Sequence, residues 1–298
     1  MSLRNSNEFI ICNQIGCGAF GEVFLVRQKS TRQVYAMKRL LKENIIAMAN
    51  TVSFENEINI MTKSKSEWIV KLHYTFEDTI YQYMVMDFMP GGDIDTLMIK
   101  HNIPEKWALF YTMELILAVD AVHQLGYIHR DIKPANMLLD RNGHLKLADF
   151  GVVACMDDDG LVRSSIAVGT PEYMSPEVLM SQDRNGCYGR ECDWWAVGIF
   201  VYEIMVGDMP FETQEKTIDF QNSLHFPDSP PINEHAKSLI KGFLTDRMER
   251  LGRHSVDDIK LHPIFSNALW KFENIHQSIA PIVPKLSSDD DTSNFVLF

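Results

Sequence analysis

The spacing of apolar residues follows a strand period in the first part of the chain and a helical period in much of the rest. Residues 8–26 predict a strand, a glycine-rich turn and a second strand, and residues 34–38 predict a further strand. A short apolar run at 84–86 predicts a buried strand. Leu145 and Leu147 alternate with polar neighbours, which indicates another short strand.

Other segments carry apolar residues at helical spacing. These residues are Phe54, Ile58 and Met61 in 53–65, and Phe110, Met113, Leu117 and Ala121 in 105–125. Residues 194–206 are apolar almost throughout, which predicts a buried helix; the run contains Glu203 and is too short to cross a bilayer. Strands first and helices afterwards predict an α+β fold with a small β-rich lobe and a larger helical lobe.

Length and charge narrow the class of protein. The chain has 298 residues, which suits two lobes sharing a cleft better than one core. Its formal net charge of -12 disfavours nucleic acid or an anionic membrane as the main partner. The charge favours basic peptides as partners, although acidity that serves solubility explains it equally well.

Cysteine usage and the start of the chain bear on location. The five cysteines are odd in number and show no C-x-x-C spacing, so neither zinc nor a disulfide framework is indicated. No charged-then-apolar signal peptide opens the chain. We therefore expect a reducing, cytoplasmic location with no membrane span.

Glycines are concentrated between the first two predicted strands. Gly16, Gly18, Gly21 and Val23 fit the pattern G-x-G-x-x-G-x-V. Glycines let a backbone approach phosphate groups and offer amide donors with no side chain in the way. The same glycines also mark dinucleotide-binding folds, but there a helix follows them. Here the run 22–26 is β-branched and aromatic, so a strand follows and a loop covering phosphates between two strands is favoured.

The densest run of candidate catalytic residues is H-R-D-I-K-P-A-N at 129–136, followed by the D-F-G that begins at Asp149. This order resembles the catalytic and metal-binding loops of protein kinases. Phosphoryl transfer depends on positioning and charge neutralisation around phosphates. Asp131 is predicted to accept the proton of the attacking hydroxyl, and Lys133 to neutralise the transferring phosphate. Asn136 and Asp149 offer the hard oxygen ligands that magnesium prefers.

A lysine ends the strand at 34–38. This strand matches the V-A-I-K type, so we predict that Lys38 holds the α- and β-phosphates of ATP. The predicted helix at 53–65 offers two carboxylates as its partner. We choose Glu57, because Glu55 points about half a turn away. We expect Lys38 to be a partly exposed cleft charge whose loss leaves the fold intact.

The strand at 84–86 leads into turn-rich residues 87–92, which indicate a hinge between the lobes. Met86 is expected at the back of the adenine pocket, where it also fills the core. The backbone groups of Asp87 and Met89 are expected to bind the edge of the base.

Several other residues receive structural interpretations. His129 is predicted to be a packed core residue, because the histidines follow no metal-ligand pattern. Asp193 lies in the apolar helix and must be hydrogen-bonded, since a lone buried carboxylate is costly; we expect the catalytic-loop backbone as its partner. Residues 157–160 predict a solvated turn. Composition alone predicts that 266–298 are disordered.

With these residues in hand, nearly the whole chain resembles an AGC-type serine/threonine protein kinase, of the branch containing the Rho-associated, myotonic dystrophy and citron kinases. The runs that carry the resemblance are YMVMDFMPGG at 83–92, GHLKLADFG at 143–151, SSIAVGTPEY at 164–173, YGRECDWW at 188–195 and DDTSNF at 290–295. The resemblance implies a bilobal fold, with an N-lobe at 1–88, a C-lobe at 89–265 and part of the family's C-terminal tail at 266–298.

The resemblance also implies particular roles. The tail would wrap the small lobe and place Phe295 in the adenine pocket, which overrides the prediction of disorder. Lys133 with Thr170 is the serine/threonine pattern, and Glu177 would pair with Arg250. The residues implied to bind ATP are Ile15, Gly16, Cys17, Gly18, Ala19, Phe20, Gly21, Glu22, Val23, Ala36, Lys38, Met86, Asp87, Met89, Asp93, Leu138 and Phe295. Two magnesium ions are expected on Asn136 and Asp149, with Asp131, Lys133, Lys38 and Glu57 as catalytic residues.

The chain departs from this family at four places. Ala135 replaces a usual acidic residue, and Ile166 stands where the activation-loop threonine aligns. We expect Ile166 to pack on the large lobe, contributing about 1.5–3 kcal/mol if fully buried. The stretch 211–226 is several residues short, which curtails a helix that often docks partners. The N-terminal dimerisation segment, the hydrophobic motif and the coiled coil of the family lie outside this chain.

These features lead to one favoured function and one alternative. We expect protein substrates with basic residues upstream of the serine or threonine, contacted by Asp93 and Glu203. Homodimerisation or regulation by Rho-type GTPases is expected only through segments outside this chain. The alternative is a pseudokinase or nucleotide-binding scaffold, which would be indicated by the loss of Lys38, Asp131, Asn136 or Asp149; all four are present.

Overall fold

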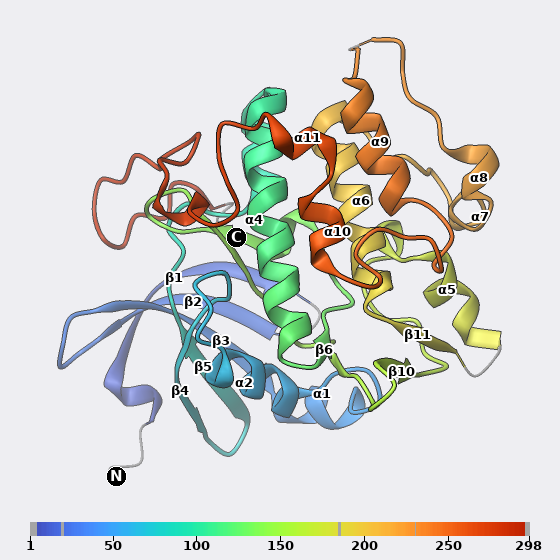
Figure 1. The fold of residues 1–298 in the computed structure, drawn as a ribbon. Helices are drawn as coiled ribbons and strands as arrows, with labels where there is room; N and C mark the ends of the chain where they lie inside the picture. Colours follow the sequence, from blue (N-terminus) through green and yellow to red (C-terminus); the bar gives the residue numbers. More distant parts are fainter. Residues whose placement is uncertain (1–4, 19–20, 184–185, 230, 296–298) are drawn as a thin grey trace.

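The smaller lobe is built on one antiparallel sheet, at the lower left of Figure 1. The structure, a computed structural model, describes residues 5–18, 21–183, 186–229 and 231–295. The strands of the sheet are β1 (Phe9–Gly18), β2 (Gly21–Gln28), β3 (Val34–Leu41), β4 (Leu72–Glu77) and β5 (Tyr81–Met86). They lie in the order β1-β2-β3-β5-β4, so β3 is central and β1 and β4 are at the edges.

The alternation of side chains gives this sheet two different faces. Its outer apolar cluster consists of Phe9, Phe24, Val26, Tyr35, Met37, Tyr83 and Val85. Ile15, Leu25 and Ala36 form a separate cluster on the other face. Val23 lies opposite Lys38, and Ala36 lies opposite Met86, so the register places Lys38 and Met86 on this second face.

Two helices belong to the smaller lobe: α1 (Lys42–Ala47) and α2 (Phe54–Lys63). The Ser53 hydroxyl caps α2 by accepting a hydrogen bond from the Asn56 N–H at 3.3 Å. Along α2, Glu57 and Met61 are buried whereas Glu55 is exposed. The helix predicted at 53–65 is therefore confirmed, and it carries one carboxylate inward.

The larger lobe is mainly helical, and α4 and α6 pack against each other at its centre (Figure 1). Its helices are α3 (Ile94–Lys100), α4 (Glu105–Gln124), α5 (Pro176–Leu179), α6 (Glu191–Val206), α7 (Gln214–Ile218), α8 (Phe220–Ser223), α9 (Glu234–Phe243), α10 (Val256–Lys260) and α11 (Pro263–Ser266). The buried, apolar helix predicted at 194–206 is α6, which ends where Gly207 adopts a left-handed conformation. The predicted α+β fold with a β-rich and a helical lobe is confirmed.

Short strand pairs position the loops that border the cleft. They are β6 (Tyr127–Ile128) with β9 (Ala154–Cys155), β7 (Met137–Leu139) with β8 (Leu145–Leu147), and β10 (Leu161–Arg163) with β11 (Cys187–Gly189). The β7–β8 pair holds the segments that end at Asn136 and begin at Asp149 side by side, because Met137 lies opposite Leu147. The predicted alternation of Leu145 and Leu147 is confirmed, since both are buried.

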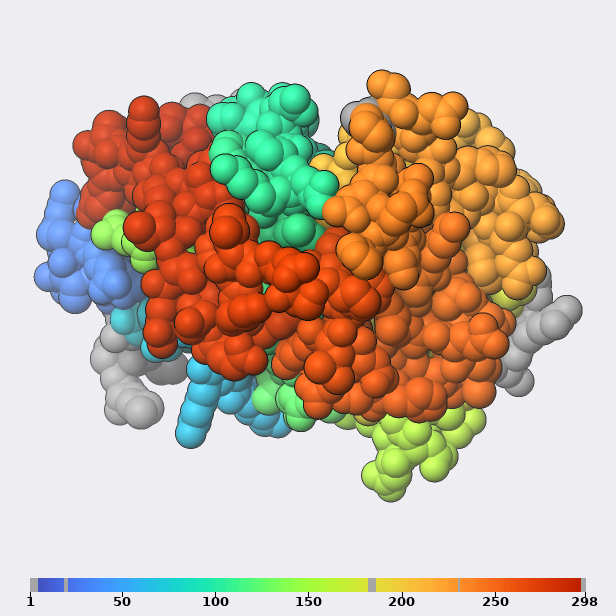
Figure 2. Space-filling view, turned by 45° about the horizontal axis from the view of Figure 1, so that its top comes forward, coloured from blue at the N-terminus to red at the C-terminus, as the bar shows by residue number. Residues whose placement is uncertain are grey.

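Residues after α11 run back across both lobes to the first strands, as the red end of the chain shows in Figure 2. They have little regular secondary structure, but side-chain contacts hold them in place. Asn13 Nδ2 donates to Thr292 Oγ1 at 3.2 Å, and Asn294 Nδ2 donates to the Pro90 carbonyl at 3.0 Å. The described part of this tail is thus placed by its contacts, as the resemblance implied and as composition alone did not.

Two further expectations can be compared with the structure. Between 211 and 226 the chain forms only the short helices α7 and α8. Glu177 pairs with Arg250, whose side chain is almost fully buried.

Among the described residues, no helix combines the length and apolar character needed to cross a membrane.

Candidate active site

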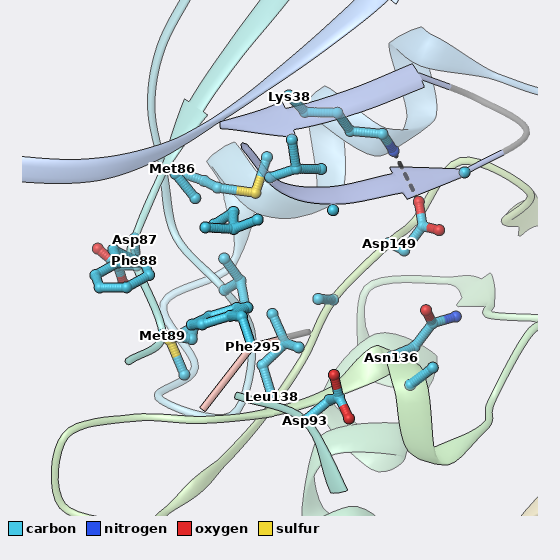
Figure 3. A pocket seen from close by; sticks show the side chains of 18 of the residues that line it. Lys38, Met86, Asp87, Phe88, Met89, Asp93, Asn136, Leu138, Asp149 and Phe295 are labelled. Carbon is cyan, nitrogen blue, oxygen red and sulfur yellow. Dashed lines mark hydrogen bonds and ion pairs between the residues drawn. The ribbon is translucent and has the colours of Figure 1, made fainter. Parts of the chain in front are cut away.

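A cleft of about 540 Å³ lies between the sheet and the helical lobe (Figure 3). Its walls come from the β1–β2 turn, β3, β5 and the segment after it, the catalytic loop, and the tail. Nearly all of the residues predicted to bind a nucleotide line it: Ile15, Gly16, Cys17, Gly18, Gly21, Val23, Ala36, Lys38, Met86, Asp87, Met89, Asp93, Leu138 and Phe295. Elements far apart in sequence therefore converge on one site.

Three of the residues predicted to bind a nucleotide are not among these lining residues. Ala19 and Phe20 lie outside the described residues, so their placement stays a prediction. Glu22 requires a correction: side chains alternate along β2, so its carboxylate lies on the outer face and pairs with Arg39 at 2.7 Å.

A triad of charged side chains crosses the upper part of the cleft, with Lys38 and Glu57 buried and Asp149 33% exposed. The Lys38 Nζ lies 2.7 Å from Glu57 Oε1 and 2.7 Å from Asp149 Oδ1. Figure 3 shows Lys38 reaching from β3 toward Asp149 on the opposite wall. The choice of Glu57 over Glu55 as the partner of Lys38 therefore agrees with the geometry. The expectation that Lys38 is partly exposed is wrong, because its side chain is only 9% exposed.

Opposing effects set the protonation of this triad. Burial alone would lower the pKa of Lys38, but the carboxylates of Asp149 and Glu57 outweigh burial and hold that pKa above its usual value. Burial raises the pKa of Glu57, and Lys38 offsets only part of the rise. For Asp149, the attraction of Lys38 outweighs burial, so its pKa lies below the usual range. Lys38 and Asp149 are thus held charged near neutral pH.

The loop at 129–136, which is predicted to be catalytic, presents Asp131 within a set of hydrogen-bond donors. Thr170 donates to Asp131 Oδ1 from its backbone N–H at 2.8 Å and from its hydroxyl at 2.7 Å. On the other carboxylate oxygen, Lys133 Nζ lies 2.9 Å away and Asn136 Nδ2 donates at 3.0 Å. Lys133 also donates to Thr170 Oγ1 at 2.6 Å. These contacts fix the orientation of the carboxylate and keep a cation beside it.

A buried carboxylate below the loop fixes its backbone. Asp193 of α6 accepts hydrogen bonds from the backbone N–H groups of His129 at 2.8 Å and Arg130 at 2.9 Å. Its Oδ2 also contacts His123 Nε2 at 2.8 Å. The predicted partnership of Asp193 with the loop is confirmed. His129 is fully buried and contacts the Ala148 carbonyl, as expected of a core residue.

The two loops that carry Asp131 and Asp149 contain unusual backbone. Arg130 has φ of 68° and Asp149 has φ of 58°, in the left-handed region that non-glycine residues seldom adopt. Gly169 has φ of +112°, and a Cβ there would lie 2.2 Å from the Arg130 carbonyl oxygen. Glycine therefore allows the segment carrying Thr170 to approach the catalytic loop closely. Backbone strain of this kind is concentrated at functional sites.

The hinge and the tail close the inner end of the cleft. The carboxylate of Asp87 contacts His73 at 2.6 Å, so it points away from a ligand. The Phe295 ring stacks on Phe88, with ring centroids 5.6 Å apart and an interplanar angle of 21°. Figure 3 shows Phe295 between Met89 and Leu138.

Sequence reasoning missed several lining residues, including Val70, Phe88, Asp95, Thr96 and Ala148. Ala148 directly precedes Asp149 and could have been found from the alternation after Leu147. Phe88 could have been found from its place in the hinge. Val70 and Thr96 have no chemical signal of their own; only the fold brings them to the cleft.

The sequence model of the protein kinase domain family matches residues 9–265 of this chain. The chain belongs to the protein kinase family. It is 54% identical to Rho-associated protein kinase 1 of Homo sapiens, over 97% of this chain and 22% of that protein. It is 50% identical to Rho-associated protein kinase let-502 of Caenorhabditis briggsae, over 94% of this chain and 24% of that protein. It is 46% identical to serine/threonine-protein kinase MRCK beta of Rattus norvegicus, over 97% of this chain and 17% of that protein.

The chain spans about a fifth of the length of these curated relatives. A protein kinase domain uses ATP as its phosphate donor, so the cleft is that of a nucleotide-using family. The Lys–Glu ion pair and the metal-binding aspartate of an active kinase must both be in place. In this kinase domain the Lys38–Glu57 ion pair is formed, and Asp149 contacts the same lysine.

The activation segment of the kinase domain differs from our expectation. Ile166 is 37% exposed, so the expected burial against the larger lobe is wrong. Its backbone N–H and carbonyl both contact the Ser164 hydroxyl at 3.2 Å, in an exposed turn. Arg130 is instead held by Val152, to whose carbonyl its Nε donates at 2.6 Å, and by the hydroxyl of Tyr188 at 3.2 Å. Tyr188 is fully buried.

Proposed function

We propose that this chain catalyses transfer of the γ-phosphate of ATP to serine or threonine hydroxyls of protein substrates. The observation that carries the proposal is the convergence of two charge groups on one cleft. One is the triad of Lys38, Glu57 and Asp149, and the other is Asp131 with Lys133 and Thr170. The serine/threonine preference is supported by the contact between Lys133 and Thr170 and by the relatives' names.

The nucleotide would lie with its base toward the hinge. Within the described residues, the Asp87 N–H already donates to the Lys71 carbonyl and the Met89 carbonyl accepts from Gly92. The Asp87 carbonyl and the Met89 N–H are then left for the edge of adenine. Met86 and Phe295 would contact the faces and rear of the base, and Lys38 would hold the α- and β-phosphates. The glycine-rich turn would cover the phosphates with backbone N–H groups.

The residues present fit magnesium. The Asn136 amide nitrogen donates to the backbone carbonyl and carboxylate of Asp131, at 2.8 and 3.0 Å, so its amide oxygen is left for a cation. Asp149 engages Lys38 through Oδ1 and keeps Oδ2. No group of three or more acidic, histidine or cysteine side chains arranged for a metal occurs in the described residues, which suits an ion that relies largely on phosphate and water. Bound magnesium would neutralise charge on the phosphates.

In the transfer step, the substrate hydroxyl oxygen attacks the γ-phosphorus and the bond to the β,γ-bridging oxygen breaks, releasing ADP. The hydroxyl proton passes to the Asp131 carboxylate, which the Thr170 contacts hold in one orientation. Lys133, 2.9 Å from that carboxylate, would place its charge beside the transferring phosphate.

The proposed reaction can be tested with purified chain, radiolabelled ATP and magnesium on a degenerate serine/threonine peptide array. Transfer above that of an Asp131→Asn control supports the proposal. Tight nucleotide binding with no transfer to any peptide would favour the alternative, a pseudokinase scaffold.

We infer further that substrates carry basic residues upstream of the target hydroxyl. Asp93 and Asp95 line the cleft close to Ala135, and Glu203 accepts a hydrogen bond from the Tyr173 hydroxyl at 2.6 Å. None of these three carboxylates forms an ion pair within the described residues. Burial and the neighbouring Asp93 raise the pKa of Asp95, and burial raises that of Glu203, so a substrate cation would relieve both. Asp93 also caps α3 through Thr96, which leaves less of it for a substrate.

Ala135 gives a direct prediction about this specificity. Ala135→Asp should strengthen selection for arginine near the phosphoacceptor, by about 1.5–3 kcal/mol or roughly ten- to a hundredfold, because it adds a charge-assisted partner. The measurement is kcat/KM for matched peptides with arginine or norleucine upstream. Ala135→Asn controls for side-chain size without charge. Equal arginine preference in wild type and Ala135→Asp would refute the assignment.

Activity is proposed not to require a phosphate on the activation segment. In many kinases a phosphate there pairs with the arginine that Arg130 represents. Here Val152 and Tyr188 already hold Arg130, and Ile166 has no hydroxyl.

We expect phosphatase treatment, or Ser164→Ala with Ser165→Ala, to leave kcat unchanged. Tyr188→Phe should lower kcat about two- to tenfold, because one buried hydrogen bond to a charged group is lost. The value of kcat on a peptide is measured for wild type before and after phosphatase treatment, and for each variant. A large loss of activity after phosphatase, reproduced by the double alanine variant, would identify Ser164 or Ser165 as the switch instead.

Full-length partners and location also remain proposals. We propose that the full-length protein shares substrates with the Rho-associated kinases. Segments outside this chain would provide regulation by Rho-type GTPases and homodimerisation. A cytoplasmic location is supported by the cysteines, all of which are free in the structure.

A further inference from the structure

An arginine of the small lobe is joined to consecutive carboxylates of the tail. Arg27 on β2 contacts Asp289 through both Nη atoms, at 3.1 and 2.8 Å, and Asp290 Oδ2 through Nη2 at 2.5 Å. Its Nη1 also donates to the Arg32 carbonyl at 2.7 Å. The Arg27 side chain is only 15% exposed, so the tail covers most of this charge. We call the contact of Arg27 with Asp289 and Asp290 the tail clamp.

Two serines stand directly before these carboxylates. Ser287 and Ser288 are both exposed, in a stretch without helix or strand. Ser288 donates its hydroxyl proton to Asp290 Oδ1 at 2.6 Å, the carboxylate whose other oxygen contacts Arg27. Ser287 likewise donates to Asp291 at 2.7 Å. The Ser288 hydroxyl is therefore one contact away from the clamp.

The clamp lies shortly before the residues that complete the nucleotide cleft. Thr292 contacts Asn13 of β1, and its carbonyl accepts a hydrogen bond from Phe295 N–H at 3.0 Å. Asn294 donates to the hinge carbonyl of Pro90, and Phe295 stacks on Phe88. A change at Asp290 is thus transmitted along a few residues to a ring that lines the cleft. Figure 2 shows this part of the chain on the molecular surface beside the first strands.

We propose that Ser288 is a phosphorylation site for a protein kinase with a basic peptide-binding site, and that its phosphate opens the tail clamp and weakens nucleotide binding. The effect on nucleotide binding rests on the proposed function, whereas the opening of the clamp does not. The chemical basis for the modifying enzyme is the run of carboxylates at 289–291, directly after an exposed hydroxyl. Such a run complements a cationic peptide site.

The same chemistry argues against self-modification. The cleft mouth of this chain is lined by Asp93 and Asp95, which would repel an incoming peptide of three consecutive carboxylates. The modifying enzyme is therefore a different kinase. In the step, Ser288 Oγ attacks the γ-phosphorus of that enzyme's ATP and the bond to the β,γ-bridging oxygen breaks. ADP leaves, and the hydroxyl proton passes to the enzyme's general base.

The effect on the clamp follows because phosphorylation replaces the donating Ser288 hydroxyl with a phosphate, whose oxygens only accept hydrogen bonds. Before modification, the Ser288 O–H donates to Asp290. Afterwards that position carries no donor and about -1.5 to -2 charges, next to the carboxylates of 289–291. Asp290 therefore loses the hydrogen bond from Ser288, and repulsion from the phosphate acts against its contact with Arg27. The contact of Asp290 with Arg27 is weakened, and the same repulsion acts on Asp289, so the clamp opens more readily.

The experiment uses the chain with phosphoserine installed translationally at 288. Binding of a fluorescent, non-hydrolysable ATP analogue with magnesium is measured, together with hydrogen exchange of peptides covering 286–295. We expect about a five- to tenfold weaker affinity for the analogue and faster exchange of the tail. Phosphoserine at the exposed Ser266 of α11 is the matched control, and it should change neither. Incubation with casein kinase 2, an acidophilic kinase, should place phosphate at Ser288 of the unmodified chain, read by mass spectrometry.

Arg27→Gln separates clamp opening from general charge effects. Without the phosphate, Arg27→Gln should reproduce the faster hydrogen exchange of the tail. In the Arg27→Gln chain, phosphoserine at 288 should weaken the affinity for the analogue by less than a further twofold. Unchanged tail exchange in the phosphorylated wild type, tighter analogue binding, or absence of modification by casein kinase 2 would each overturn the proposal. If the chain binds no nucleotide at all, the proposed function fails, while tail exchange still decides whether the clamp opens.

Discussion

Replacing Asp131 with asparagine is expected to lower kcat by about 10²- to 10⁴-fold, the contribution of a positioned general base. The affinity for the ATP analogue should be nearly unchanged, because Asp131 acts on the substrate hydroxyl. Its carboxylate lies beside Lys133 and Thr170, away from the hinge that would bind the base. Single-turnover transfer from radiolabelled ATP and equilibrium binding of the analogue measure the two quantities separately.

The structure also indicates a side effect that needs a control. Both carboxylate oxygens of Asp131 accept hydrogen bonds, from Thr170 and from Asn136. In the asparagine variant, the NH₂ group replaces one of these oxygens and faces a donor, so that hydrogen bond is lost. A modest loss of thermal stability is therefore expected. Asp158→Asn makes the same chemical change in an exposed turn and should alter neither kcat nor stability. A fall in kcat of less than tenfold in a folded Asp131→Asn protein would place the general base elsewhere.

Lys38→Met is expected to abolish measurable transfer and also to destabilise the fold. Lys38 is buried between two carboxylates, so its removal leaves Glu57 and Asp149 without their shared cation. Breaking a buried ion pair on one side costs about 3–5 kcal/mol, although protonation of a carboxylate relieves part of this. Urea unfolding of wild type and variant gives the difference. This expectation replaces the one drawn from sequence, in which the fold was unaffected.

The loss of stability should depend on pH in a definite direction. Burial already raises the pKa of Glu57, and without Lys38 that pKa rises further. Folded Lys38→Met protein then binds a proton that the unfolded chain releases, so its stability falls as pH rises through the raised pKa. The deficit relative to wild type should be larger at pH 8 than at pH 6. Equal stability of the two proteins at both pH values would show that the triad contributes nothing to folding.

Sequence patterns predicted the parts of the site that chemistry constrains most. Asp131, Lys133, Asn136 and Asp149 stand in motifs whose spacing leaves little freedom, and all of them border the one cleft. Glu57 could be separated from Glu55 because helical geometry allows only one of them to face inward.

The errors arose where the outcome depends on tertiary packing. The exposure of Lys38 is set by how closely α2 approaches the sheet, which no local pattern records. Ile166 is apolar, but single apolar side chains are common on surfaces, so its burial did not follow from its type. Glu22 was assigned by its place in a glycine-rich motif, whereas strand alternation turns its side chain outward. Composition alone indicated a disordered tail, and only the family resemblance pointed to an ordered one, because that order comes from contacts with residues far away in sequence.

That distance has a consequence for biosynthesis. Asn13 and Thr292 are separated by 279 residues, so the wall formed by Phe295 is the last part of the cleft to leave the ribosome. The buried core residues Ile275 and Ala280 precede Asp289. Both lobes can therefore form their cores before residues 289–295 arrive, since domains fold from the N-terminal end during synthesis. Released chains that end just before Asp289 should therefore be folded, with an unfinished nucleotide pocket. Competence for ATP would be acquired as a late, separate event in the life of each molecule.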